Sequence, residues 1–405
     1  MNLRYDYRRW TPQHPLTYLG VINAGANEGS AEKMAEVLRD ALNSPYISGR
    51  TIVTHSLDEL KQVLQQNRHS APEVWGIGGG DATSYKVITE MYRQGYPTPL
   101  MLLIYTLGTA NLKGAAYSLG GGFADKIFRR SHLPTVPLRL AQHFKESIEF
   151  GQEPYTKPFK IVDVNGEKGS MIGFGGTVKL MWRYYQKTQE QYERLQERLG
   201  NASPSVDYAR IFAEIWDEPQ LVEEVKKALP FGLGTLSTRM LGNGLETMIN
   251  TFLEMLAKEK RDYYQEPLSL EAYVDGKKVD TGKAHSIFIS TFPRVKIAPL
   301  LSIYPLPEAE KDPDCFQMLF CSHTVAELFE NVLPMRFGVH LPKNDYRQVR
   351  RLDLVSKQPI LAQIDGDFAT LDKKVSVTMG ETQRVVCLPN EGIINTFLDP
   401  FGLSF

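Results

Sequence analysis

The stretch Gly78-Gly79-Gly80-Asp81-Ala82-Thr83 joins an apolar run at residues 74–77 to a segment in which Val87, Ile88 and Met91 recur at helical spacing. This pattern predicts a strand, a glycine turn and a helix. Three consecutive glycines let a backbone approach a ligand without Cβ collisions, and a helix start directs free amides and a positive dipole end at an anion. We therefore interpret the stretch as a phosphate-binding loop.

The same unit occurs four times within the first 120 residues. The expected strands cover residues 16–22, 51–54, 74–77 and 100–105, and each is followed by a turn and a helical pattern. Ser56 and Glu59 form a capping box at the start of the second helix. Alternating units of this kind imply a parallel sheet flanked by helices, with ligands at the carboxyl ends of the strands.

Small-residue loops follow three of these strands, at residues 23–29, 78–83 and 107–111. Thr83 and Thr109 can each donate a hydroxyl hydrogen bond to a ligand in these loops. Asp81 would repel a bare phosphate, so its presence favours a bridging divalent ion or a role in handling a substrate hydroxyl. A purely structural turn is the alternative interpretation of each loop taken singly. The three loops together at one sheet edge favour phosphate binding.

Composition excludes several classes of function. A chain of 405 residues is expected to form two domains, and a net charge of -1 gives no global field for nucleic acid. Cys315, Cys321 and Cys387 are too few for a disulfide framework or a zinc site, which favours a reducing compartment. The sequence shows neither a signal peptide at its start nor about 18 consecutive apolar residues. A cytoplasmic protein is expected, with peripheral membrane contact as an added possibility and the oligomeric state, a homodimer included, left open.

The second half of the chain has a different pattern. Short β-branched and aromatic runs with polar turns around residues 145–180 and 268–390 predict an antiparallel β-sandwich. Helical patterns between them predict an insertion at about 182–262. We expect an α/β domain at 1–140, completed by residues 392–405, and a sandwich domain at 141–391.

Several motifs resemble the catalytic domain shared by diacylglycerol kinases, sphingosine kinases and bacterial YegS-like lipid kinases. Residues 76–95 (GIGGGDATSYKVITEMYRQG) and 99–120 (PLMLLIYTLGTANLKGAAYSLG) are similar to the G-G-D-G-T segment of that family and the P-L-G-T-x-N segment that follows it. Residues 161–167 (IVDVNGE) and 171–181 (MIGFGGTVKLM) look like its strand pair opening the lipid-binding domain. Later segments at 301–319 and 361–389 resemble its D-G and D-G-E regions.

The resemblance implies an ATP- and Mg²⁺-dependent kinase that phosphorylates a hydroxyl of a diacylglycerol-like or sphingoid lipid. It places Asp81 near the transferred phosphate and Asp367 as the base that deprotonates the lipid hydroxyl. It assigns a structural magnesium to Asp314. The residues expected to contact ATP are Asn23, Thr54, Gly78, Gly79, Gly80, Asp81, Ala82, Thr83, Gly108, Thr109 and Asn111.

Three positions depart from the family pattern. Ala82 replaces a glycine, Asp367 is one methylene shorter than the family's glutamate, and Lys86 reverses the charge of a glutamate. We interpret Lys86 as a solvated side chain, with phosphate contact as the other possibility. These departures support one rival, a degenerate lipid-kinase fold that binds nucleotide or lipid without turnover. A second rival is an NAD-kinase-like enzyme, which shares the glycine motif and the sandwich partner domain.

Overall fold

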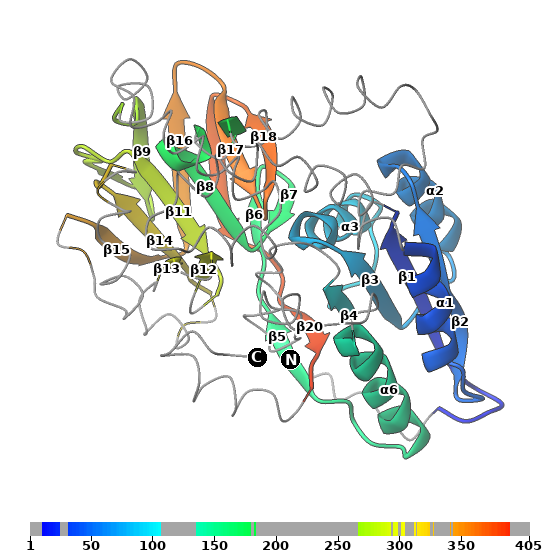
Figure 1. The fold of residues 1–405 in the computed structure, drawn as a ribbon. Helices are drawn as coiled ribbons and strands as arrows, with labels where there is room; N and C mark the ends of the chain where they lie inside the picture. The colour runs from blue at the N-terminus through cyan, green and yellow to red at the C-terminus, as the bar shows by residue number, and fades with distance from the viewer. Residues whose placement is uncertain are drawn as a thin grey trace, which may run out of the picture.

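The computed structural model describes residues 10–24, 31–106, 135–179, 182–183, 266–292, 295–298, 301–303, 312, 314–324, 327, 341 and 343–388. Within them the chain forms one mixed six-stranded sheet covered by helices and two antiparallel six-stranded sheets (Figure 1). The mixed sheet and its helices lie on one side of the molecule and the antiparallel sheets on the other (Figure 1).

The mixed sheet confirms the parallel arrangement expected for the N-terminal part. Its order is β2 (Ile47–Thr54), β1 (Leu16–Asn23), β3 (Val74–Gly79), β4 (Met101–Thr106), β20 (Gln383–Val386) and β5 (Thr156–Phe159). All neighbours pair in parallel except β20 and β5, which are antiparallel. The described helices of this region are α1 (Ala31–Ala41), α2 (Leu57–Asn67), α3 (Asp81–Arg93) and α6 (Thr135–Glu149).

Burial explains why these segments form strands and helices. Every residue of β3 is buried, as expected for a strand covered on both faces. Helix α1 buries Met34 and Leu38 along one stripe. The predicted capping box opens α2, where the Ser56 hydroxyl accepts from the Glu59 amide at 3.1 Å. The Glu59 carboxylate in turn accepts from the His55 amide at 2.7 Å, one residue before the cap.

Helix α6 corrects the prediction that residues from about 145 onward form strands. It continues to Glu149, and buries Leu140, Phe144 and Ile148 at a helical spacing of four residues. None of the helices in the described ranges is long and apolar enough to cross a membrane.

Two strands extend the mixed sheet with residues from far along the chain. Both β5 and β20 were expected in the sandwich, yet β20 pairs with β4 and β5 pairs with β20. The expected boundary at residue 140 also falls inside α6. The division into 1–140 and 141–391 stays a prediction, and residues 392–405 and 184–262 lie outside the described ranges.

The two antiparallel sheets share one apolar core. The first has the order β10 (Lys277–Val279), β9 (Leu270–Val274), β16 (Arg351–Ser356), β19 (Lys374–Met379), β6 (Val162–Val164) and β7 (Glu167–Gly169). The second has the order β15 (Asp345–Val349), β14 (Phe316–Cys321), β11 (Ser286–Ser290), β8 (Met171–Gly175), β17 (Ile360–Ile364) and β18 (Asp367–Leu371). Strands β12 (Val295–Ala298) and β13 (Leu301–Ile303) form a separate hairpin. Phe174 and Phe316 from one sheet and Leu352 from the other belong to the same buried cluster.

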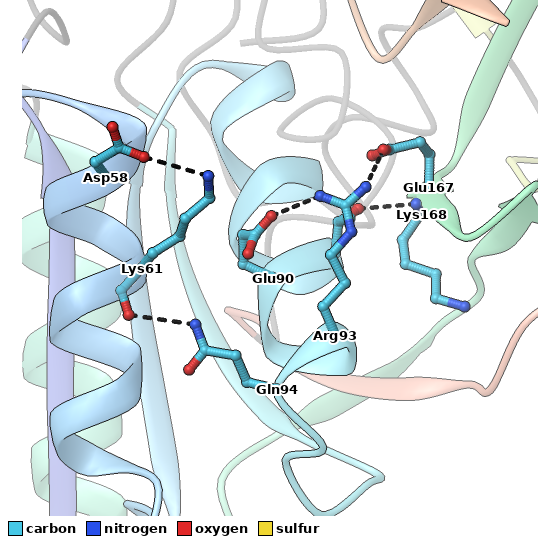
Figure 2. Close-up of polar contacts among 8 residues, drawn as sticks. Asp58, Lys61, Glu90, Arg93, Gln94, Glu167 and Lys168 are labelled. Atoms are coloured by element: carbon cyan, nitrogen blue, oxygen red, sulfur yellow. Dashed lines mark hydrogen bonds and ion pairs between the residues drawn. The ribbon is translucent and has the colours of Figure 1, made fainter.

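Helix α3 connects the two regions. Tyr85 on this helix is buried in the core of the antiparallel sheets. The Thr89 hydroxyl accepts from the backbone amide of Lys168 on β7 at 2.8 Å. Arg93 lies between Glu90 on its own helix, at 2.6 Å, and Glu167 on β7 (Figure 2). The helix that begins at the glycine stretch is therefore fixed to the second region along its length.

The turn between β17 and β18 is held by a buried aspartate. Asp365 is only 2% exposed and has a φ of 48°, a left-handed conformation that Asp tolerates better than most residues. Its carboxylate accepts from the Ser170 hydroxyl at 2.6 Å and from the Met171 amide at 2.8 Å. These bonds tie the turn to the start of β8.

Removing Arg93 should destabilise the protein, because Glu90 is almost fully buried and would lose its cationic partner. We expect Arg93→Met to lower the free energy of unfolding by about 2 kcal/mol, measured by chemical denaturation. Adding Glu90→Gln to Arg93→Met should recover part of the loss. Lys61→Met is the control, since Lys61 pairs with an exposed Asp58. Equal effects of the two single substitutions would contradict this assignment.

Asp365→Ala should be the more damaging of two aspartate substitutions in turns. It leaves the donors at the start of β8 unpaired in the interior, at a cost of about 2–4 kcal/mol in unfolding free energy. Asp280→Ala is the control, because Asp280 is exposed and caps only the Gly282 amide. A thermal unfolding curve for Asp365→Ala that overlays that of Asp280→Ala would refute the proposed role of Asp365 in holding the turn.

Candidate functional site

Four parallel strands end together at one edge of the mixed sheet. Asn23 pairs with Thr54, and Gly79 pairs with Thr106, so the ends of β1 to β4 lie in register. In the strand order β2-β1-β3-β4, β2 lies on one side of β1, whereas β3 and then β4 follow on the other side. The order therefore reverses between β1 and β3, and ligands of open α/β sheets bind in the crevice at such a reversal.

The glycine stretch forms the strand-to-helix junction at that reversal. Gly78 and Gly79 complete β3, Gly80 is the N-cap of α3, and Asp81 is the first helical residue. Gly80 has no side chain that could cap the amides at this helix start, and the Thr83 amide donates to the Gly80 carbonyl at 3.1 Å. The first amides of this 13-residue helix and the positive end of its dipole therefore lie at the strand ends. This arrangement suits a phosphate group.

Asn23 and Thr83 link the first loop to the glycine stretch. The Asn23 side-chain amide donates to the Thr83 hydroxyl at 3.3 Å. Gly79 leaves the space for Thr83, since a Cβ on Gly79 would lie 2.4 Å from that hydroxyl oxygen. The residue type at Gly79 is therefore set by close packing within the site as well as by any ligand.

The structure describes some of the other predicted contact residues and leaves others outside the described ranges. Thr54 lies beside Asn23, but its buried hydroxyl donates to the Ile22 carbonyl at 3.4 Å. Gly78 is part of the ladder between β1 and β4. The side chains of Asp81 and Ala82 lie outside the described part of the chain, as do Gly108, Thr109 and Asn111. Their expected roles stay predictions.

Asp367 lies against the same helix that starts at the glycine stretch. It opens β18, and its Oδ2 atom forms an ion pair with Nζ of Lys86 on α3. This contact corrects the interpretation of Lys86 as simply solvated. The two side chains are 46% and 36% exposed, so both remain accessible to a ligand. The carboxylate forms no other hydrogen bond or ion pair with the described residues.

Tyr85, next to Lys86, is surrounded by negative charge. Burial raises the pKa of its phenol well above the ordinary value, and the carboxylates of Glu167, Asp367 and Asp365 raise it further. The phenol therefore stays protonated at any physiological pH. Its ring packs in the core of the antiparallel sheets, which fixes the part of α3 that carries Lys86.

An aromatic pair flanks Asp367 on the edge strand β18. Phe368 follows Asp367 directly and contacts Trp182, with ring centroids 5.0 Å apart at an interplanar angle of 74°. The Trp182 side chain is 37% exposed. Because successive side chains on a strand point to opposite faces, this aromatic pair lies on the other face of β18 from the Asp367 carboxylate.

The magnesium role predicted for Asp314 stays a prediction, because residues 304–311 and 313 beside it lie outside the described part of the chain. Asp314 is exposed, and its amide donates to Oδ1 of Asp312 at 2.9 Å. The bond from the Asp314 amide, with those from Arg350 and Cys315, lowers the pKa of the Asp312 carboxyl. Among the residues that the structure describes, no cluster of three or more His, Cys, Asp or Glu side chains could hold a metal ion.

Sequence reasoning missed two features of this site: the burial of Tyr85 in the second core, and the ion pair between Lys86 and Asp367. Tyr85 lies outside the apolar stripe that faces the mixed sheet, so its position gave a signal for a second contact face on α3. The partner of Lys86 is 281 residues away in the sequence, and no local pattern indicates such a pair.

Comparison with solved structures supports the same arrangement. A structure described as a diacylglycerol kinase from Bacillus anthracis str. Sterne matches with a TM-score of 0.52 and 11% identity, covering 92% of this chain and 97% of that one. Two further structures from the same organism, with the same but provisional description, match at TM-scores of 0.54 and 0.55 and 12% identity. Both also cover 92% of this chain and 97% of the other.

Sequence comparison gives no such match. No protein-family profile matches the chain, and no curated protein matches it significantly. At these identities the structural likeness establishes the fold, over nearly the whole length of both chains. The chain has the two-region fold of the diacylglycerol kinase-like lipid kinases.

Proposed function

We propose that the protein is a lipid kinase that transfers the γ-phosphate of ATP, with Mg²⁺, to a hydroxyl of a diacylglycerol-like or sphingoid lipid. The observation that carries this proposal is the position of the Asp367 carboxylate beside α3, the helix whose N-terminus follows the glycine stretch. A phosphate bound at the start of α3 would lie on the helix that also carries Lys86, the ion-pair partner of this candidate base.

In this proposal each residue of the site has its own role. The first-turn amides of α3 and the Thr83 hydroxyl would hold phosphate oxygens, and the Asn23 amide fixes the Thr83 side chain. Asp367 would accept the proton of the acceptor hydroxyl through Oδ1, because Oδ2 is bound to Lys86. Bound magnesium would neutralise phosphate charge. In this proposal, Asp81 and ATP itself would supply ligands of that ion.

The acceptor is proposed to be a lipid because a structure with this fold is described as a diacylglycerol kinase. The aromatic pair of Phe368 and Trp182 lies on the other face of β18 from Asp367 and is not assigned to the acceptor site. Such an acceptor resides in a membrane, so the protein would work at the cytoplasmic membrane surface as a peripheral protein. Nucleic acid is not proposed as a partner.

One observation favours the rival of a binding protein without turnover. Lys86 occupies one oxygen of the carboxylate that would act as the base. The lysine ammonium thus competes with an acceptor hydroxyl for this carboxylate. The rival and the kinase therefore differ in whether a bound lipid is phosphorylated.

The test is a radiolabel transfer assay on the full chain. We expect γ-labelled ATP with magnesium to label diacylglycerol or sphingosine in mixed vesicles. Because Asp367 would lose its ability to accept the proton, Asp367→Asn should reduce kcat by about a hundredfold or more. Asp280→Asn, in an exposed turn, should keep the wild-type rate.

Two results would count against the kinase proposal, and a third would count against the role of Asp367. ATP binding without labelled lipid would support the binding protein. Phosphorylation of NAD with no labelled lipid would support the NAD-kinase-like rival. Undiminished turnover in Asp367→Asn would remove this residue from the role of base.

A further inference from the structure

The ion pair between Lys86 and Asp367 joins the two regions at the helix that begins at the glycine stretch. Asp367 comes from β18 in the second antiparallel sheet, and Lys86 comes from α3, which packs against the mixed sheet. Three other contacts along α3, made by Tyr85, Thr89 and Arg93, keep the helix on the second region. These three contacts hold Lys86 and Asp367 close together in addition to the attraction between their charges.

The direction of the lysine side chain places the pair toward the glycine stretch. Side chains on a helix tilt toward its N-terminus, and Lys86 is five residues after the first helical residue, Asp81. This offset corresponds to about 7.5 Å along the axis at 1.5 Å per residue. A four-carbon stem that leans back along the helix would bring its ammonium group closer to a phosphate bound at the first turn of α3.

Lys86 and Asp367 would act on a bound phosphate in opposite directions. Asp367 alone would repel a polyphosphate bound at the start of α3, and Lys86 alone would attract it. Both side chains are partly exposed, at 46% for Lys86 and 36% for Asp367, so each can act on a ligand through the intervening solvent. Asp365 and Glu167 add further negative charge nearby, and Arg93 already has two carboxylate partners.

We propose that Lys86 is a positioning residue that holds Asp367 beside the nucleotide phosphates and cancels its repulsion of them. Lys86 thereby lets a carboxylate lie next to a polyanion without loss of affinity. This inference rests on the nucleotide-binding part of the proposed function and extends it, because it assigns a role to a residue that the lipid kinase proposal does not require.

The test is a double-mutant cycle on ATP binding, which needs no turnover. ATP with magnesium is titrated into the full chain by calorimetry, for the wild type, Lys86→Gln, Asp367→Asn and the double variant. Lys86→Gln should weaken binding about three- to tenfold, since it leaves the carboxylate unbalanced. Asp367→Asn should tighten binding by a similar factor, since it releases the ammonium. The double variant should bind within about twofold of the wild type.

The opposite signs distinguish positioning from a merely structural role. If the pair only stabilised the junction, both single substitutions would weaken binding. Lys86→Arg should keep wild-type affinity, because it retains the cation. Lys61→Gln is the matched control, with a lysine on α2 that is 44% exposed and paired with Asp58, and it should leave affinity unchanged. Thermal unfolding of each variant checks that it is folded.

The outcomes separate the inference from the kinase proposal. Opposite shifts in the two single variants support the inference even if no lipid is phosphorylated, in which case the kinase proposal alone fails. Shifts of the same sign, or no shifts, overturn the inference even when lipid is phosphorylated. A wild-type chain that binds no ATP overturns both.

Discussion

The seating of α3 against the second region is the contact on which the rest of the site depends. The N-terminus of this helix lies at the reversal of strand order in the mixed sheet, and its outer face carries Tyr85, Thr89 and Arg93 onto β7 and the second core. Because one rigid element makes both contacts, the position of the glycine stretch fixes the position of Asp367. Burial of Tyr85 and the bonds made by Thr89 and Arg93 supply the free energy that holds this geometry.

The glycine-rich segment serves three separate purposes. Gly76, inside β3, makes room for Tyr18, whose hydroxyl would lie 2.2 Å from a Cβ there. Gly79 makes room for Thr83. Gly80, at the helix N-cap, lets a ligand approach the first turn. A run of glycines after a strand therefore indicates a crowded junction, of which ligand binding is one cause.

Local signals predicted the parts of the fold that depend on local structure. The four parallel strands, the capping box at Ser56 and the antiparallel character of the second half followed from periodicity and turn residues. The strand exchange of β20 did not, because pairing between β20 and β4 joins residues about 280 positions apart, and such register depends on the assembled sheet. Helix α6 had a clear apolar stripe at Leu140, Phe144 and Ile148 that outweighs the β-branched residues nearby.

The candidate site was predicted in the same uneven way. Asn23, Gly79 and Thr83 lie together at the sheet edge where the loops were predicted, because each lies at the end of a strand or the start of a helix, and their contact with ATP stays a prediction. The pairing of Lys86 with Asp367 arises only when the two regions meet.

A crystal structure with magnesium and a non-hydrolysable ATP analogue tests the central claim most directly. The account predicts phosphate oxygens on the first-turn amides of α3, with the Lys86 ammonium between them and Asp367. A nucleotide bound elsewhere, or phosphates held away from Lys86, would contradict it.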